Sequence, residues 1–270
     1  MDIESHGGYD PSEVMDATEP GPKCVQGVPF WRQTISPSGS EDCLLLDVLV
    51  PKTPSSGSLP VLVQIHGGGR HTGLSSRGAV LTREFAGYDQ GYSQSNPGYM
   101  LVNQSNSGMI YVSIQYRLAV FGFLSSAEVR ENGDANGGLL DQRAALNWVQ
   151  RNIRAFGGDP SKVTIIGGSA GGGSVMTQMI LYGGVSNPPF RSAISEYPWW
   201  QSYKNGTVLE AQYRQMLAAT ACNDLACLRN QSTDDLIGAM QATFDVGFNE
   251  GWYGHGDFYY GPAVDGSAIR

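Results

Sequence analysis

One serine in this sequence stands where its hydroxyl could act as a nucleophile. Ser169 is the centre of a Gly-x-Ser-x-Gly pattern formed with Gly167 and Gly171, and it follows the apolar run Val163–Gly167. When a strand turns sharply into a helix through this pattern, the serine hydroxyl is presented at the carboxyl end of a sheet. The glycines let neighbouring backbone pass without a Cβ clash, and the helix N-terminus favours developing negative charge. The order of strand, turn and helix therefore predicts nucleophilic catalysis at Ser169, against the plainer interpretation of a flexible Gly-Ser turn.

A second glycine-rich segment could stabilise the negative charge that such an attack creates. The apolar run Val61–His66 leads into Gly67–Gly69, which completes a His-Gly-Gly-Gly motif. In this motif, backbone N–H groups approach a substrate carbonyl and form an oxyanion hole. A phosphate-binding loop is the rival interpretation, but the Lys and the Ser or Thr that should follow are absent. His66 precedes Ser169, the wrong order for a catalytic histidine in this kind of site, so we expect it to hold the loop.

Short apolar runs bounded by Gly, Pro or polar residues predict the strands that must position these groups. The runs are Cys43–Val50, Val61–His66, Met109–Gln115, Val163–Gly167 and Ser192–Glu196. Their continuous hydrophobicity is typical of strands that are covered on both faces, as in a parallel sheet.

Apolar residues spaced three and four apart predict the helices. The clearest pattern covers about Leu139–Ala155, and weaker ones cover Leu209–Thr220 and Asp234–Thr243. Strands that alternate with helices predict an α/β fold with a mainly parallel central sheet flanked by helices. No linker divides the chain, so we expect residues 1–270 to form a single domain, with residues 1–23 as extended loop.

Composition narrows the classes of partner. The 270 residues are 41% hydrophobic, and 17 basic against 25 acidic residues give a net charge of -8, which argues against nucleic acid or an anionic membrane as the main partner. No stretch approaches the roughly 18 continuous apolar residues of a membrane span. The N-terminus lacks the basic and apolar regions of a signal peptide. The four cysteines could pair or could remain reduced thiols.

Five motifs follow one another along the chain in an order that identifies a family. They are Glu41–Pro51, His66–Gly69, Tyr116–Leu124, Asn136–Arg143 and Phe156–Gly171. Together they resemble the type-B carboxylesterases, the family of cholinesterases, fungal lipases and neuroligins, over about residues 24–270. The resemblance implies an α/β-hydrolase fold and hydrolysis of a carboxylic ester through an acyl-enzyme, with a small-molecule ester as the partner and no cofactor or metal.

The resemblance also implies roles for individual residues. Ser169 matches the nucleophile, and Gly68, Gly69 and Ala170 match the three N–H donors of the oxyanion hole. Gly168 departs from the pattern, because the family usually has Glu before the nucleophile.

Two further departures fall beside the expected site. Arg70 and His71 stand where an aromatic residue usually follows the glycines. The segment Glu196–Gln201 falls where the family builds its acyl pocket, and its Trp199 and Trp200 could narrow that pocket or be plain core.

The cysteines acquire partners through the resemblance. Cys24 and Cys43 match the first disulfide of the family, at the rim of the active-site gorge, and Cys222 and Cys227 match the second. Three N-x-S/T sequons are candidate glycosylation sites: Asn103, Asn205 and Asn230. Disulfides and sequons imply a secreted glycoprotein, although this chain carries no signal peptide.

The most consequential departure is the absence of the catalytic partners. In the family the acid and the histidine lie well downstream of the serine, and this chain stops in a stretch that resembles the segment before the acid. The only histidine after Ser169 is His255, near Asp245, Glu250 and Asp257, and its glycine-rich setting predicts a surface loop rather than a triad.

We therefore expect a fragment whose sheet is truncated at both ends. Without its base, the serine hydroxyl is a weak nucleophile, so the chain alone should be weakly active or inactive. A small uncharged or aryl ester is the expected substrate. The alternative is a non-catalytic binding protein on the same fold, as neuroligins are. The sequence leaves the oligomeric state open.

Overall fold

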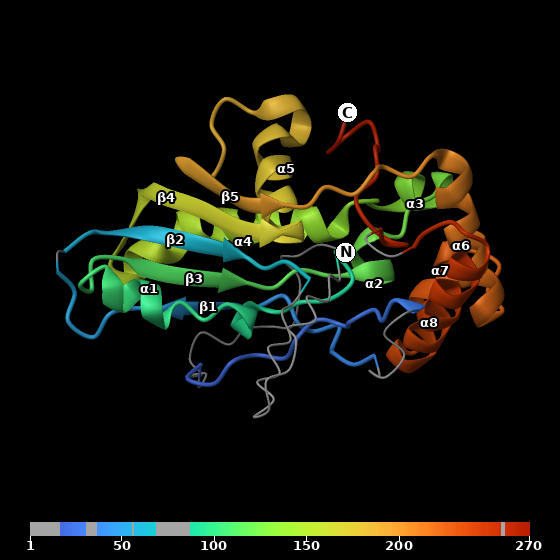
Figure 1. The fold of residues 1–270 in the computed structure, drawn as a ribbon, viewed down its shortest axis with the longest axis horizontal. Coiled ribbons are helices and arrows are strands. Elements are labelled where there is room, and N and C mark those ends of the chain that lie inside the picture. The colour runs from blue at the N-terminus through green and yellow to red at the C-terminus, as the bar shows by residue number, and fades with distance from the viewer. Residues whose placement is uncertain (1–16, 31–36, 56, 69–86, 255–256) are drawn as a thin grey trace, which may run out of the picture.

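A computed structural model describes residues 17–30, 37–55, 57–68, 87–254 and 257–270. Within this part of the chain, five strands form one sheet in the order β1-β3-β2-β4-β5 (Figure 1). The strands are β1 (Leu46–Leu49), β2 (Leu59–Ile65), β3 (Ile110–Ile114), β4 (Gly158–Ser169) and β5 (Ser192–Pro198). Strand β1 runs antiparallel to β3, and every other neighbouring pair is parallel. The five predicted strands and the mainly parallel sheet are therefore confirmed.

Helices connect and cover the strands. Those of the described residues are α1 (Tyr99–Gln104), α2 (Ala119–Phe123), α3 (Ala127–Asn132), α4 (Gly137–Asn152), α5 (Ala170–Gly184), α6 (Gly206–Thr220), α7 (Leu225–Arg229) and α8 (Thr233–Asn249). Helices α4 and α5 pack against each other and against β4, while α6 packs against α8. Figure 1 shows α6, α7 and α8 gathered beyond the carboxyl ends of β2, β3 and β4.

The predicted helices agree with these elements at most of their bounds. The pattern over Leu139–Ala155 corresponds to α4 and to the 3-10 turn Ile153–Phe156 that follows it. The predicted third helix stops at Thr243, whereas α8 continues to Asn249. The short helices α1, α2, α3 and α7 have five or six residues each, fewer than two turns, so no periodic pattern announces them.

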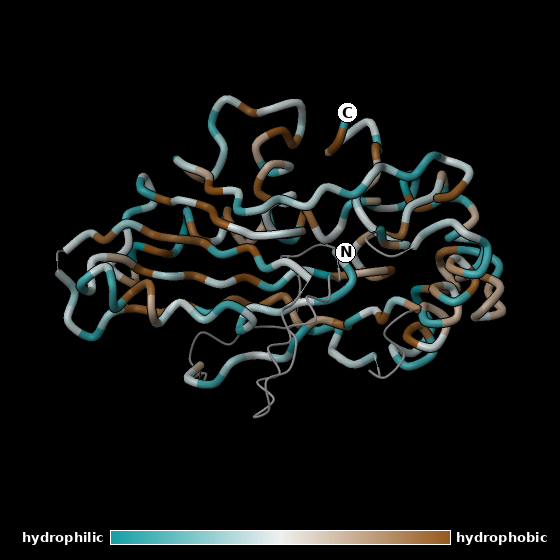
Figure 2. Tube along the Cα trace, viewed as in Figure 1, coloured by the Kyte–Doolittle hydropathy of each residue, from teal (hydrophilic) through white to brown (hydrophobic). Residues whose placement is uncertain are grey.

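The hydrophobic core lies along the inner strands. Figure 2 shows hydrophobic residues running along β2, β3 and β4, and all five residues of β3 are buried. This burial explains why the strands are continuously apolar in sequence. Strand β5, at one edge of the sheet, is different: six of its seven residues are exposed. Apolar residues are also exposed on the neighbouring helix α5, at Met176, Met179 and Ile180.

Two disulfides join the four cysteines in the pairing that the resemblance implies. Cys24 is bonded to Cys43 with their Cα atoms 4.9 Å apart, and Cys222 is bonded to Cys227 with a Cα separation of 5.5 Å. The second bridge ties the end of α6 to α7. Among the residues that the structure describes, no helix is both long and apolar enough to cross a membrane.

Candidate functional site

Ser169 stands at the junction between β4 and α5, where the sequence predicts a sharp turn. It is half-buried, and its backbone has φ 57° and ψ -126°. A positive φ costs a residue with a Cβ roughly 1–2 kcal/mol, and such strained residues gather at functional sites. Ala170, the first residue of α5, is buried directly behind it. The predicted order of strand, strained serine and helix is thus present.

The glycines around Ser169 are required by close backbone contacts. A Cβ on Gly167 would lie 2.5 Å from the carbonyl carbon of Gly171 and 2.9 Å from the carbonyl oxygen of Ile65. A Cβ on Gly171 would clash with that oxygen and with the carbonyl group of His66. Real Cβ atoms essentially never approach other atoms so closely, so both positions need glycine. The reason given for these glycines from sequence therefore matches the packing of β2 against the start of α5.

The loop after β2 lies directly against the turn at Ser169. A Cβ on Gly67 would be 2.5 Å from the carbonyl oxygen of Gly168 and 3.3 Å from the Cβ of Ser169. Gly68 is buried at the same place. Gly69, together with Arg70 and His71, lies outside the described residues. The structure thus brings the loop and the serine together, as a site of this kind requires.

His66 is fixed by its own loop and by a tyrosine. Its ring stacks on that of Tyr116 at 4.2 Å between centroids, and the Tyr116 hydroxyl donates a 2.7 Å hydrogen bond to the His66 carbonyl oxygen. Its Nδ1 lies 3.2 Å from the carbonyl oxygen of Gly67. Complete burial lowers the pKa of His66 to about 4, against a smaller opposing effect of the Gly67 contact, so the imidazole is neutral at pH 7. Tyr116 begins the motif Tyr116–Leu124, but nothing in the sequence pattern indicates this role.

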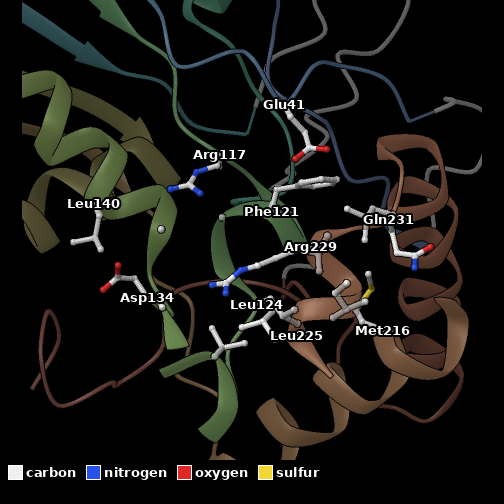
Figure 3. Close-up of a pocket in the computed structure, with 17 residues that line it drawn as sticks. Glu41, Arg117, Phe121, Leu124, Asp134, Leu140, Met216, Leu225, Arg229 and Gln231 are labelled. Carbon is white, nitrogen blue, oxygen red and sulfur yellow. The ribbon is translucent and has the colours of Figure 1, made fainter. Parts of the chain in front are cut away.

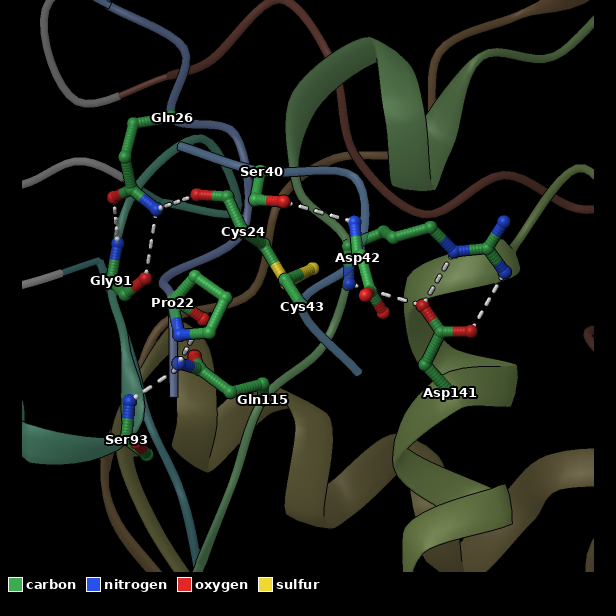
Figure 4. The surroundings of a disulfide bond; sticks show 11 residues. Pro22, Cys24, Gln26, Ser40, Asp42, Cys43, Gly91, Ser93, Gln115 and Asp141 are labelled. Carbon is green, nitrogen blue, oxygen red and sulfur yellow. Dashed lines mark hydrogen bonds and ion pairs between the residues drawn. A yellow bond between two sulfur atoms is a disulfide. The ribbon is translucent and has the colours of Figure 1, made fainter. Parts of the chain in front are cut away.

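The loop that contains Gly91 packs against the loop after β2 and connects it to a disulfide. Gly91 has φ 127° and no room for a Cβ beside His66 and Gly67. The side-chain amide of Gln26 forms two hydrogen bonds with Gly91: it accepts from the Gly91 N–H at 2.7 Å and donates to the Gly91 carbonyl oxygen at 3.0 Å (Figure 4). The same amide also donates to the Cys24 carbonyl oxygen at 2.7 Å. The Cys24–Cys43 bridge is thereby linked through hydrogen bonds to Gly91, which packs closely against the glycine loop beside Ser169.

The two tryptophans after β5 have different surroundings. The backbone N–H of Trp199 donates a 2.9 Å hydrogen bond to the Ser169 carbonyl oxygen, and the Trp199 ring packs edge-on against Phe258 at 5.1 Å between centroids. Trp200 is 39% exposed and meets the edge of Tyr203 at 6.2 Å. Trp199 is therefore packed with other aromatic residues while Trp200 faces solvent, and a role for either in narrowing a pocket stays a prediction.

Three acidic residues near His255 in sequence have separate surroundings in the structure. Asp257 forms an ion pair with the Nζ of Lys204 at 2.5 Å, and Glu250 follows the end of α8. Asp245 has a buried carboxylate oxygen that finds no hydrogen-bond partner among the described residues. His255 lies outside the described residues. Within the described part of the chain, no histidine hydrogen-bonds to the Ser169 hydroxyl, and no cluster of His, Cys, Asp and Glu could hold a metal ion.

The three sequons lie on the surface. Asn103 is exposed in α1, and Asn230 is exposed after α7. Asn205 is exposed too, although its side-chain oxygen accepts a hydrogen bond from the Val208 N–H and so caps α6. Their modification stays a prediction.

A cavity of about 260 Å³ lies away from Ser169, between α2, α4, α7 and α8 (Figure 3). Apolar side chains such as Phe121 and Leu225 form much of its wall, and Arg117 and Arg229 stand at its charged side. Arg117 is held by Asp141 through contacts of 2.7 and 2.8 Å. No serine, cysteine or histidine is among the described residues that line it, so this cavity offers no nucleophile.

Comparisons with known proteins show which family this chain resembles. The profile of the family described as "Carboxylesterase family" matches residues 10–270. The chain is 38% identical over 250 residues to Carboxylesterase patB of Aspergillus clavatus, covering 86% of this chain and 40% of that protein. It is 39% identical over 224 residues to the Secreted triacylglycerol lipase LIP1 of Gibberella zeae, covering 76% of this chain and 34% of the relative.

Solved structures agree with the sequence comparison. A PNB esterase structure superposes with a TM-score of 0.74 at 32% identity, covering 95% of this chain and 48% of the other. The fold is therefore that of the α/β-hydrolase esterases. The chain spans less than half the length of each of these relatives.

Proposed function

Because the chain belongs to the carboxylesterase family, we propose that it is a carboxylic ester hydrolase in which Ser169 is the nucleophile. The observation that carries this proposal is the strained turn at Ser169, packed against the glycine loop after β2. The names of its relatives, a carboxylesterase and a triacylglycerol lipase, support carboxylic esters as the substrate class. A small uncharged or aryl ester is the proposed substrate.

In the proposed reaction, the Ser169 oxygen attacks the carbonyl carbon of the ester. The carbonyl oxygen becomes an oxyanion that accepts hydrogen bonds from the N–H groups of Gly68, Gly69 and Ala170. The alcohol leaves with a proton, and the acyl group remains on the Ser169 oxygen until water releases it as a carboxylic acid. Donors of this kind are worth about 3–4 kcal/mol each, because they are already oriented when the charge develops.

The chemistry also needs a base to take the proton of the Ser169 hydroxyl. Within the described residues, no histidine forms a hydrogen bond with that hydroxyl. The Nδ1 of His66 instead contacts the carbonyl oxygen of Gly67, and the His66 carbonyl oxygen accepts a hydrogen bond from Tyr116. A serine site that lacks a triad member keeps only about 10³ to 10⁴-fold catalysis over water, from the oxyanion hole and binding. We therefore expect this chain alone to hydrolyse esters weakly.

Hydrolysis of p-nitrophenyl acetate tests the proposal. The wild-type chain should exceed the buffer rate, Ser169→Ala should abolish the excess, and Ser192→Ala should keep it. Ser192 is a suitable control because it is exposed at the start of β5. Equal rates for wild type and Ser169→Ala would contradict an enzymatic role for Ser169 and would favour a non-catalytic binding protein.

We also propose that the protein is secreted and glycosylated. The two disulfides support an oxidising compartment, and one relative is a secreted lipase. Expression in a secreting fungal host, followed by glycosidase treatment, should lower the apparent mass of the protein. No change in mass would contradict modification at the three sequons.

A further inference from the structure

Helix α1 carries three adjacent apolar side chains that are exposed to solvent. Tyr99, Met100 and Leu101 follow one another along the chain and are 63%, 69% and 42% exposed. Val102 is the buried residue of this helix, which packs against β3. Single exposed apolar residues are common on protein surfaces, whereas adjacent ones form a patch that binds a partner or needs to be covered.

No charge close along the chain interrupts this patch. Residues 91–116 contain no Asp, Glu, Lys, Arg or His. Charged side chains that break up apolar areas are what normally keeps a protein surface soluble. Another polar group must therefore cover the patch if the chain is to stay monomeric in solution.

The sequon residue Asn103 lies on the same side of α1 as two of these apolar residues. Successive residues of an α-helix are rotated by about 100°, which places Asn103 about 40° from Tyr99 and about 60° from Met100 around the helix. Residues three and four apart are neighbours on a helix surface. Asn103 is exposed, and its sequon ends at Ser105, the residue that follows α1. A sugar on the Asn103 side chain would therefore begin directly beside Tyr99 and Met100.

We propose that an N-linked glycan on Asn103 covers this patch, with its first sugar packed against Tyr99 and Met100. This inference rests on the proposed glycosylation of the chain. The first N-acetylglucosamine is bonded to the side-chain nitrogen of Asn103, so its ring stays within reach of the preceding turn of α1. A sugar ring presents C–H groups that pack on the face of an aromatic ring, while its hydroxyl groups remain in water.

The other two sequons have different surroundings. Asn205 caps α6 through its side-chain oxygen and follows Lys204 in sequence. Asn230 follows the exposed Arg229, and Leu228, the large apolar residue nearest to Asn230 in sequence, is buried. A glycan on Asn230 would therefore have no apolar patch of this kind to cover, which makes Asn230 the matched control.

The test expresses the chain in a secreting fungal host and compares wild type with Asn103→Gln. Glycopeptide mass spectrometry should find sugar on Asn103. Asn103→Gln should bind more of the dye bis-ANS and sediment faster, because the uncovered patch binds the dye and joins copies of the chain. Asn230→Gln should show neither change. Adding Tyr99→Ser and Met100→Ser to Asn103→Gln should restore the wild-type values.

Trimming with endoglycosidase H separates the packing of the first sugar from the bulk of the whole glycan. The enzyme leaves one N-acetylglucosamine on each modified Asn, so trimmed wild type should still bind little bis-ANS. If the trimmed chain binds as much dye as Asn103→Gln, the first sugar does not cover Tyr99 and Met100 and the inference is wrong.

Three further outcomes would overturn the inference. Sugar on Asn205 or Asn230 but not on Asn103 would overturn it alone, and so would an Asn103→Gln chain that behaves as wild type. Binding of the glycosylated chain to phosphatidylcholine vesicles, lost with Tyr99→Ser and Met100→Ser, would show a free lipid-binding surface instead. Sugar on none of the three sequons would overturn the proposed glycosylation and the inference with it.

Discussion

Replacing Tyr116 by Phe removes one hydroxyl from the support of the glycine loop. That hydroxyl donates to the His66 carbonyl oxygen at 2.7 Å, and both residues are fully buried. The aromatic ring, and with it the stacking on His66, is retained. The substitution therefore isolates the hydrogen bond that holds the peptide between His66 and Gly67.

The expected magnitude follows from burial of the His66 carbonyl. A typical hydrogen bond contributes about 1 kcal/mol net, but a buried acceptor left without its partner costs about 1–3 kcal/mol. The Tyr116→Phe chain should lose stability in that range. The loop carries the proposed oxyanion donors, so a misplacement equivalent to about 1.4 kcal/mol would also lower kcat tenfold.

The assays are urea unfolding and hydrolysis of p-nitrophenyl acetate, with Tyr260→Phe as the control. Tyr260 is also fully buried, and its hydroxyl bonds to the Thr243 hydroxyl at 2.6 Å, away from the loop. Thr243 keeps a second partner, the Met240 carbonyl at 2.7 Å, so the control should lose only about 1 kcal/mol and no activity. If kcat is unchanged in Tyr116→Phe, or if Tyr260→Phe lowers kcat by the same factor, the role given to Tyr116 is wrong.

Three further outcomes follow from the same contacts. Burial lowers the pKa of His66 to about 4, below its unfolded value of 6.5, so the unfolded chain binds more protons between these values. Stability should therefore fall by up to about 3 kcal/mol as the pH drops from 6.5 to 4, and His66→Gln should flatten this slope in urea titrations at successive pH values. Replacing Cys24 and Cys43 by Ser should cost about 3 kcal/mol, because their sequence separation of 19 closes a longer loop than the separation of 5 between Cys222 and Cys227, where a cost of about 2 kcal/mol is expected. The first replacement should also slow ester hydrolysis through the link to the glycine loop while the second should not, and equal effects on hydrolysis would argue against that link.

Sequence patterns predict the sheet well because burial on both faces leaves a strong signal. The apolar run at Met109–Gln115 corresponds to β3, whose residues are all buried. Strand β5 was also predicted correctly, although most of its residues are exposed, because the short run Ser192–Glu196 is bounded by prolines, Pro189 before it and Pro198 after it. The short helices left no pattern, since five residues cannot repeat a period of 3.6.

The candidate site was predictable only where a motif fixes the local backbone. The strained turn at Ser169 and its need for Gly167 and Gly171 follow from the Gly-x-Ser-x-Gly pattern. The role of Tyr116 did not follow, because its hydroxyl acts through a contact with His66, a residue far away in sequence. Single-sequence patterns report periodicity along the chain, whereas such contacts depend on register between strands.

Locating a covalent label on the chain tests whether Ser169 is the nucleophile. The chain would be incubated for a long period with a fluorophosphonate, digested with trypsin, and its peptides sequenced by mass spectrometry. The peptide of residues 163–191 contains Ser169 as well as Ser174 and Ser186. We expect a label on Ser169 alone and none in the Ser169→Ala chain. A label on another serine, or an unlabelled Ser169, would contradict that role.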